Sequence, residues 1–288
     1  MKKHFYVITI ATLFLASCKD NTENKSNGNA DSAVNSKSSV DKNEINKNIH
    51  IMATPDSVAM NASTTAVIVV DMENAFGAKG GMFDRAGINI SMIQKVISPT
   101  SKVLAAARKA GIKIIYLKMA YHEDLSDLGS EESPNRMRHL HIMHVGDTIT
   151  APDGSRSRIL IRGSWSTEIV PELKPEANDI VIYKTRFSGF YKTELDSTLK
   201  KLGKTNLIIV GCTTSVCVES TIRDAFFRDY SAVLLADCTA EPIGYEFPRS
   251  NHEASLLTIQ RLFGWVSNSN EFIKAVQVQP NLNDKKLQ

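Results

Sequence analysis

The sequence has few cysteines, no marked excess of either charge and no internal repeat. Only 4 of the 288 residues are cysteine, and no CxxC pair suggests a zinc site or a redox dithiol. The net charge of +3 gives no indication of a nucleic-acid partner. No repeat with a period of about 20–50 residues is present, which excludes a solenoid. The 42% hydrophobic content is that of an ordinary globular chain.

The N-terminus has the pattern of an export signal. Two lysines, Lys2 and Lys3, precede an apolar stretch that ends in small residues and is too short to span a bilayer. The letters LASC at 15–18 resemble a bacterial lipobox, which predicts a signal peptide over residues 1–17 and a lipid on Cys18. The protein is then an exported, membrane-anchored lipoprotein of the cell envelope. A plain signal peptide followed by a chance cysteine is the alternative.

Residues 18–53 are predicted to be a disordered tether. Asn, Ser and Lys fill 18 of the 32 positions from 19 to 50, and apolar residues are almost absent. The tether leads to one folded domain over residues 54–288. Beyond Cys18, the chain has three cysteines, an odd number that leaves at least one thiol free in an oxidising compartment: Cys212, Cys217 and Cys238.

Five apolar runs alternate with helical patterns across this domain. The runs are nearly unbroken, as expected for parallel strands buried on both faces. Two helical patterns end in glycine, at Gly111 and Gly203. The alternation predicts a three-layer α/β/α fold with a mainly parallel, open, Rossmann-like sheet. The five predicted strands are 66–71, 112–118, 179–184, 206–211 and 232–237.

An acid, a base and a thiol fall at the carboxyl ends of these strands, where open parallel sheets bind ligands. They are Asp71, Lys184 and Cys217. A helix N-terminus and Lys184 are expected to lower the pKa of Cys217, and Asp71 to take the thiol proton. Backbone N–H groups of the 212–217 turn suit an oxyanion. The set predicts acyl transfer from an amide to Cys217. Alternatively, Cys217 is a small buried hydrophobe, Asp71 a helix cap and Lys184 a surface residue.

Three motifs resemble the isochorismatase-like cysteine hydrolases, and the ureidoacrylate amidohydrolase subgroup in particular. They are VVDMENAF (69–76), YKTRFSGFYKTELD (183–196) and GCTTSVCVESTIRDAFFRDY (211–230), with SPN (133–135), RGSW (162–165) and FGWVS (263–267) in support. The resemblance implies Cys217 as nucleophile, Asp71 as general base and Lys184 as its cationic partner. It also implies a cis peptide between Cys212 and Thr213, which brings the Thr213 N–H to the oxyanion. No cofactor is implied.

The sequence departs from this subgroup at positions that bear on the substrate. Glu73 stands where the subgroup has Gln, Phe76 and Phe187 stand where it has Tyr, and Met119 or a neighbour replaces an Asn. Loss of these polar groups changes hydrogen bonding to a ureido substrate and therefore preference. The residues predicted to bind substrate are Cys212, Thr213, Asn74, Phe76, Asn135, Trp165 and Phe187.

A long polar segment, 119–166, interrupts the strand–helix rhythm and is predicted to be a lid or binding loop. It carries an HxHxxH pattern (His139, His141, His144) that is interpreted as solvated rather than metal-binding, because it does not match the metal set of the related nicotinamidases. Its arginines either form a solvated basic face or include one that clamps a substrate carboxylate: Arg136, Arg138, Arg156, Arg158 and Arg162.

The sequence therefore predicts a metal-independent cysteine amidohydrolase. Its substrate is a small amide or an N-carbamoyl (ureido) compound, cleaved through a thioester-type acyl-enzyme at Cys217. A nicotinamidase-like or vinyl-ether hydrolase is the first alternative, and a membrane-tethered binding protein without turnover is the second. Relatives of this kind commonly form homo-oligomers.

Overall fold

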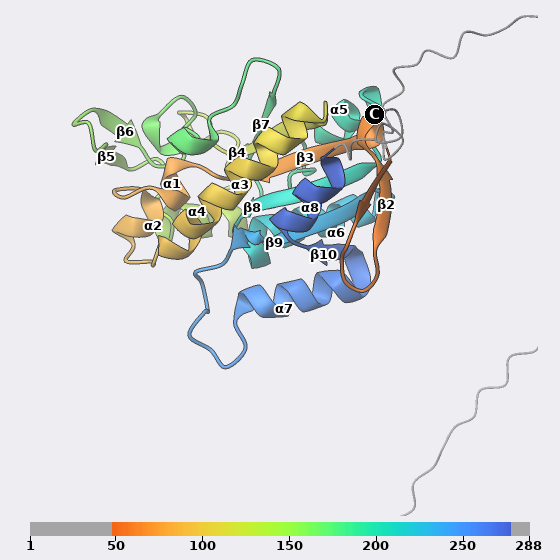
Figure 1. Ribbon diagram of the computed structural model, residues 1–288. Coiled ribbons are helices and arrows are strands. Elements are labelled where there is room, and N and C mark those ends of the chain that lie inside the picture. Colours follow the sequence, from red (N-terminus) through yellow and green to blue (C-terminus); the bar gives the residue numbers. More distant parts are fainter. Residues whose placement is uncertain (1–47, 278–288) are drawn as a thin grey trace, which may run out of the picture. The chain divides into compact units, whose positions relative to one another are not determined.

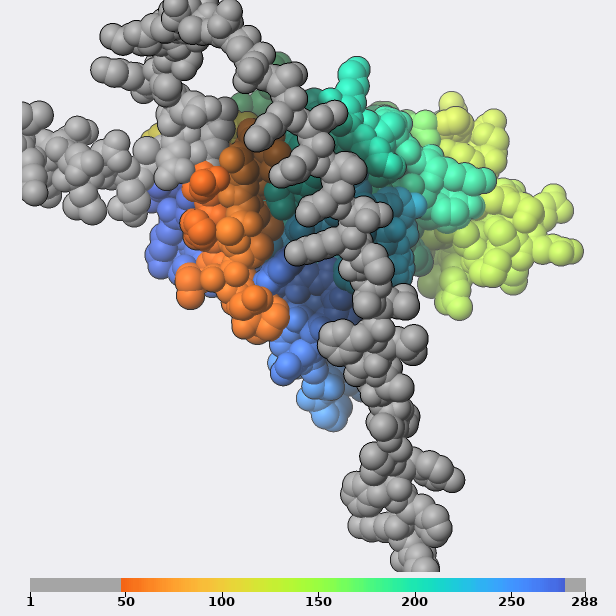
Figure 2. Space-filling model, turned by 90° about the vertical axis from the view of Figure 1, so that its right-hand side faces the viewer, coloured from red at the N-terminus to blue at the C-terminus, as the bar shows by residue number. Residues whose placement is uncertain are grey.

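The computed structural model describes residues 48–277. The predicted signal peptide, Cys18 and most of the predicted tether lie outside the described residues. The predicted end of the tether at residue 53 is wrong, because β1 (Asn48–Ile51) pairs antiparallel with β2 (Val58–Asn61). Ile49 and Ile51 alternate with exposed residues and pack their buried side chains into the core, so strand periodicity prevails over the polar composition. Figure 2 shows this hairpin in orange beside the blue C-terminal elements.

The centre of the domain is a six-stranded sheet in which every neighbouring pair is parallel. This confirms the predicted fold class and all five predicted strands. The sixth strand, β10, has only three residues and was not predicted. In spatial order the strands are β10 (Trp265–Ser267), β9 (Ser231–Ala240), β8 (Asn206–Cys212), β3 (Thr65–Val70), β4 (Lys113–Met119) and β7 (Ile180–Lys184).

Helices cover both faces of this sheet and create two apolar cores (Figure 1). On one face lie α3 (Ser91–Lys109) and α8 (Ser269–Val276), whose side chains pack with those of β1 and β2. On the other lie α5 (Leu195–Lys201) and α6 (Glu219–Phe226). Successive residues of β3 alternate between the two cores, with Val67 on one side and Ile68 on the other. That alternation explains why the strand sequences are apolar throughout.

The segment 119–166 contains structure of its own. Ser133 caps α4 (Pro134–His141) by accepting the Arg136 backbone N–H at 3.2 Å. The first residue of the helix is Pro134, whose missing N–H costs no helical hydrogen bond at that position. A hairpin of β5 (Thr148–Thr150) and β6 (Arg156–Arg158) follows. The remaining short elements are η1 (Ala62–Thr64), α1 (Asn74–Gly77), α2 (Met82–Arg85), η2 (Trp165–Thr167), η3 (Pro171–Leu173), the π-helical turn η4 (Thr214–Val218), α7 (Asn251–Thr258) and η5 (Ile259–Phe263).

The three cysteines of the domain are all buried, and no disulfide joins any pair within residues 48–277. The expectation of at least one free thiol is thus met in this part of the chain. Across the same range, no helix is both long enough and apolar enough to cross a bilayer.

Candidate active site

Asp71 follows the last residue of β3 in a conformation that few non-glycine residues adopt. Its φ is 49°, in the left-handed region, which costs roughly 1–3 kcal/mol and is typical of functional positions. Two backbone contacts hold it there. The Asp71 N–H donates to Leu117 O at 3.0 Å, and the Cys212 thiol donates to Asp71 O at 3.1 Å. Cys212, predicted to line the substrate site, therefore fixes the backbone of the acid.

Lys184 ends β7 and joins the acid to the thiol. Its Nζ lies 2.7 Å from Asp71 Oδ2 and 3.4 Å from Cys217 Sγ, and it also donates to Arg186 O at 3.2 Å. Asp71 is 0% exposed, Lys184 1% and Cys217 6%. The structure thus brings the three residues predicted from the strand ends into one buried cluster, with the thiol as its most accessible member.

Cys217 lies in η4, the π-helical turn that leads directly into α6. The carbonyl of Thr213 accepts the N–H groups of Val216 and Val218, each at 3.2 Å, and thereby begins the turn. The peptide between Cys212 and Thr213 is cis, as the resemblance implied. The turn is also held by Glu241, the residue that follows β9, which accepts the Ser215 backbone N–H at 2.9 Å and the Ser215 hydroxyl at 2.6 Å.

Burial dominates the electrostatics of the cluster. It raises the pKa of Asp71, and the ammonium of Lys184 opposes that rise. Burial also acts against the charge of Lys184, but the negative groups around it outweigh burial and raise the pKa of this lysine. The expectation of a lowered Cys217 pKa is wrong: burial and the Asp71 carboxylate raise it well above its usual range, despite Lys184. The raised pKa favours the neutral thiol of Cys217 beside the salt bridge between Asp71 and Lys184.

The arrangement leaves Asp71 able to accept a proton. Within the described residues, neither of its oxygens receives a well-oriented hydrogen bond, although Oδ2 is paired with Lys184. The Cys217 thiol is close enough to this carboxylate for each to influence the pKa of the other. A buried carboxylate with a raised pKa is a stronger base, so this geometry suits transfer of the thiol proton to Asp71.

A second buried acid, Glu73, lies next to the cluster. Its Oε1 accepts the Met119 N–H at 2.5 Å, while its Oε2 has no hydrogen-bond partner among residues 48–277. Burial and the nearby Asp71 raise the pKa of Glu73 well above its usual range. The raised pKa favours the protonated carboxyl, which is neutral, offers one donor and is close in shape and charge to the Gln that the resemblance places at this position.

The residues predicted to bind substrate separate into two groups. Asn74 donates its side-chain amide to Trp165 O at 3.0 Å, which ties α1 to η2. Phe76 packs edge-on against Phe83 within the core. Both contacts join parts of the protein to one another, and a role of Asn74 and Phe76 in substrate binding stays a prediction. Phe187, by contrast, packs against both apolar cores and lies three residues beyond the last residue of β7.

The histidines and arginines of the 119–166 segment do not act as a set. His139 is fully buried, whereas His141 is exposed and His144 lies in solvent beside Asp147. Residues 48–277 contain no group of three or more His, Cys, Asp or Glu side chains that could hold a metal ion.

Four of the arginines donate to oxygens of the segment itself: Arg136 to Leu125 O, Arg156 to the Thr148 hydroxyl, Arg158 to Gly146 O and Arg162 to Asp127.

Residues that the sequence did not single out complete the surroundings. Tyr121, buried after β4, donates its hydroxyl to Thr185 O at 3.1 Å. Arg186 donates to Thr185 O and to Asp127 O, and its own carbonyl accepts from Lys184. Tyr121 and Arg186 each lie two residues beyond the end of a strand, β4 and β7 respectively, and those ends meet at one edge of the sheet. This position could have identified both residues as candidates from the sequence.

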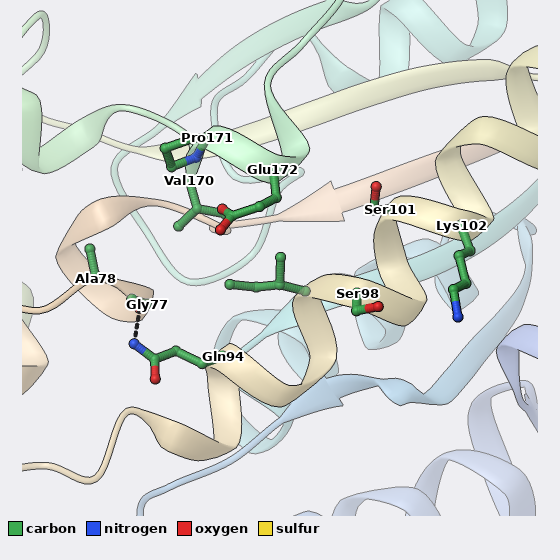
Figure 3. Close-up of a pocket in the computed structure, with 10 residues that line it drawn as sticks. Gly77, Ala78, Gln94, Ser98, Ser101, Lys102, Val170, Pro171 and Glu172 are labelled. Carbon is green, nitrogen blue, oxygen red and sulfur yellow. Dashed lines mark hydrogen bonds between the residues drawn. The ribbon is translucent and has the colours of Figure 1, made fainter.

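An open groove lies elsewhere on the domain, away from this cluster. It measures about 640 Å³ and runs between α3 and the segment 170–172, with Gln94 donating to Gly77 O at 3.3 Å across one end (Figure 3). No residue of the Asp71–Lys184–Cys217 cluster lines it. The reactive side chains therefore lie in the buried cluster and not along this groove.

Comparison with known proteins defines the class. A model of the isochorismatase domain matches residues 65–271, and the chain belongs to the isochorismatase family. Ureidoacrylate amidohydrolase RutB of Caulobacter segnis is 40% identical over 224 residues, 78% of this chain and 90% of that protein. The same-named protein of Stutzerimonas stutzeri is 38% identical over 234 residues, 81% and 91% of the two chains.

Solved structures agree with this assignment. A cysteine hydrolase from Pseudomonas syringae pv. phaseolicola 1448A is 30% identical with a TM-score of 0.62, over 76% of this chain and 94% of the other. N-carbamoylsarcosine amidase from Thermoplasma acidophilum is 25% identical with a TM-score of 0.53, over 72% and 97%.

Proposed function

We propose that this protein is a cysteine-dependent amidohydrolase that cleaves the C–N bond of a small ureido compound or amide. The observation that carries the proposal is the buried contact of Lys184 with both Asp71 and Cys217 at the carboxyl edge of the sheet. The names of the relatives support it, since they are amidohydrolases of ureidoacrylate and, among solved structures, an amidase of N-carbamoylsarcosine.

The first chemical step forms the acyl-enzyme. Asp71 takes the thiol proton as Cys217 Sγ attacks the substrate carbonyl carbon, and the carbonyl π electrons move to oxygen. Collapse of this tetrahedral species re-forms the carbonyl and breaks the C–N bond. The leaving nitrogen takes the proton back from Asp71 and departs as an amine, which leaves a thioester on Cys217.

The second step returns the enzyme to its resting form. Asp71 takes a proton from water as the water oxygen attacks the thioester carbonyl, and the C–S bond breaks. The proton on Asp71 then passes to the sulfur. A ureido substrate yields a carbamic acid in this step, which decomposes to ammonia and carbon dioxide, whereas a simple amide yields a carboxylic acid.

Lys184 and the turn around Cys217 stabilise the charges that develop. The Lys184 ammonium neutralises Asp71 at rest and lies 3.4 Å from the sulfur that becomes anionic during attack. In this proposal the N–H groups of Thr213 and Cys217 hold the oxyanion. The N–H groups of Ser215, Val216 and Val218 already donate within the protein.

Hydrolysis of a panel of compounds tests the proposal. Ammonia release would be measured from ureido acids such as ureidoacrylate, from N-carbamoyl amino acids, and from nicotinamide and other simple amides. Wild type and Cys217→Ala would be compared at equal folded concentration. Ureido turnover by wild type that falls by at least about a thousandfold in the variant supports the proposal. Equal rates, or no turnover of any compound, would favour a thiol-independent hydrolase or a binding protein.

We also propose that the enzyme is exported and anchored through a lipid on Cys18. The lipobox-like LASC at 15–18 is the basis. Fractionation of cells expressing the full chain tests this, with Cys18→Ser as the matched variant. Wild type in the membrane fraction and the variant in the soluble fraction are the expected results, and an unchanged distribution would contradict the anchor.

A further inference from the structure

His139 is the one histidine of the HxHxxH pattern that is withdrawn from solvent. It lies in the second turn of α4, is 0% exposed, and is held between two aromatic rings. Its ring centroid is 5.4 Å from that of Tyr121 and 5.7 Å from that of Phe187. Burial of an imidazole is uncommon without a hydrogen bond at each nitrogen, because an unpaired polar atom costs about 1–3 kcal/mol.

The hydrogen bond at one nitrogen fixes the tautomer. Nδ1 lies 2.7 Å from the backbone carbonyl of Asn135, one turn earlier in the helix. A carbonyl oxygen only accepts, so Nδ1 carries the proton and Nε2 of the neutral ring has a free lone pair. Nε2 has no partner anywhere in residues 48–277. His139 therefore presents a buried, unused hydrogen-bond acceptor.

The surroundings keep the ring neutral. Burial lowers the pKa of His139, and the positive charges of Arg186 and Lys184 lower it further, although the bond to Asn135 opposes this. An uncharged imidazole with Nδ1 protonated is therefore the form present at neutral pH, and its free nitrogen accepts.

The ring also lies on the side of the domain that carries the reactive thiol. Phe187, whose ring contacts that of His139, packs against the apolar core that includes Cys217, and Lys184 contacts Cys217 directly. Tyr121, in contact with the His139 ring, is hydrogen-bonded to the carbonyl of Thr185, the residue that follows Lys184. Tyr121 does not supply the missing donor, because its hydroxyl is directed to Thr185 O.

We propose that His139 Nε2 accepts a hydrogen bond from a substrate N–H beside the scissile carbonyl, and so makes the site selective for ureido compounds and amides over esters. This inference rests on the function proposed above and names the group that recognises its substrate. Ureido compounds and amides carry such an N–H, whereas an ester of the same shape does not. A buried acceptor left unpaired by the wrong substrate is a strong source of discrimination.

Two substitutions separate the acceptor from the structural hydrogen bond. His139→Asn places an amide N–H near Nδ1, which keeps the bond to Asn135 O, and deletes Nε2. His139→Gln places its amide oxygen near the position of Nε2 and loses the hydrogen bond to Asn135 O. Both would be assayed, with wild type, on a ureido acid or amide and on a p-nitrophenyl ester that acylates the same cysteine. The measured quantity is the ratio of the two kcat/KM values, which is independent of the fraction of folded enzyme.

The proposal predicts that His139→Asn lowers the ratio of ureido to ester kcat/KM about tenfold, the effect of one neutral hydrogen bond. His139→Gln should restore most of that ratio. An unchanged ratio in His139→Asn, with wild type active on both substrates, would overturn this inference and leave the proposed function intact. Ester turnover by wild type without turnover of any ureido compound or amide would overturn both.

Discussion

Replacement of Lys184 by methionine removes the only cation that lies against Asp71 in the described domain, without changing the volume of the side chain much. Asp71 and Lys184 are at most 1% exposed, and 2.7 Å separates Oδ2 from Nζ. Removing one member of a buried ion pair leaves the other charge uncompensated, which costs about 3–5 kcal/mol. We therefore expect Lys184→Met to lower the free energy of unfolding by this amount at pH 7.

The pH dependence of that loss has a definite sign. Burial raises the pKa of Asp71, and in Lys184→Met the ammonium no longer opposes the rise. A carboxyl whose pKa is higher in the folded state binds its proton more tightly there, so stability falls as pH increases above the unfolded value of 3.8. The gap between wild type and variant should thus be small near pH 4 and widen toward pH 7.

A matched control and a double variant test whether the loss of stability comes from the ion pair. Lys204 is also a buried lysine, but its Nζ donates to a backbone carbonyl, Ser63 O, and forms no salt bridge within residues 48–277. Lys204→Met should cost only about 1 kcal/mol, the value of one hydrogen bond. Asp71→Asn combined with Lys184→Met should be more stable than Lys184→Met alone, because no buried charge remains.

Urea unfolding followed by far-UV circular dichroism gives these free energies. If the effects of Asp71→Asn and Lys184→Met simply add, the two side chains are not coupled and the reasoning from the ion pair is refuted. The ion-pair argument is also refuted if Lys184→Met lowers the free energy of unfolding no more than Lys204→Met does.

Three further predictions concern neighbouring residues. Glu73→Gln removes an acid whose pKa burial raises, so wild type should lose stability relative to this variant as pH rises above about 4.5; parallel stability–pH curves would contradict it. Gly211 has φ of 120°, and an added Cβ would lie 2.0 Å from the backbone oxygen of Val70. Gly211→Ala should thus cost more than about 4 kcal/mol by chemical unfolding, whereas Gly203→Ala, with φ of 61° and open space around it, should cost roughly 1–2 kcal/mol; equal losses would refute the steric argument. Alkylation of Cys217 by iodoacetamide, followed by peptide mass spectrometry, should accelerate about tenfold per pH unit up to pH 9, because burial raises the thiol pKa; a plateau below pH 8 would show a low-pKa thiolate instead.

The sequence was sufficient to predict the parts of the fold that depend on continuous apolar runs. The five long strands were predicted because burial on both faces excludes polar residues along their length. The hairpin β1–β2 and the strand β10 were not predicted. Ile49 and Ile51 are two apolar residues among many polar ones, and β10 has only three residues. Neither segment therefore contains an apolar run long enough to be recognised as a strand from the sequence.

The reactive residues were predicted from their positions, and their electrostatics were not. Asp71, Lys184 and Cys217 stand out because each ends or follows a strand, or begins a helix, at one edge of the sheet. The direction of the Cys217 pKa depends on burial, which a sequence does not show. His139 was assigned to solvent because its neighbours are polar. Ser133 and Pro134 are typical of a helix start, and residues four apart in a helix, such as Asn135 and His139, lie on the same face. This pattern could have placed His139 on a helix that packs against the domain.

Mass spectrometry of the enzyme during turnover tests the central claim most directly. Wild type would be mixed with a ureido or amide substrate, quenched in acid within milliseconds to seconds and digested, so that every cysteine peptide is observed. The account predicts a transient mass increase equal to the acyl group on the peptide containing Cys217, formed before the amine product reaches its steady rate. Substrate turnover with no acyl group on Cys217 at any time, or turnover that persists in Cys217→Ala, would contradict it.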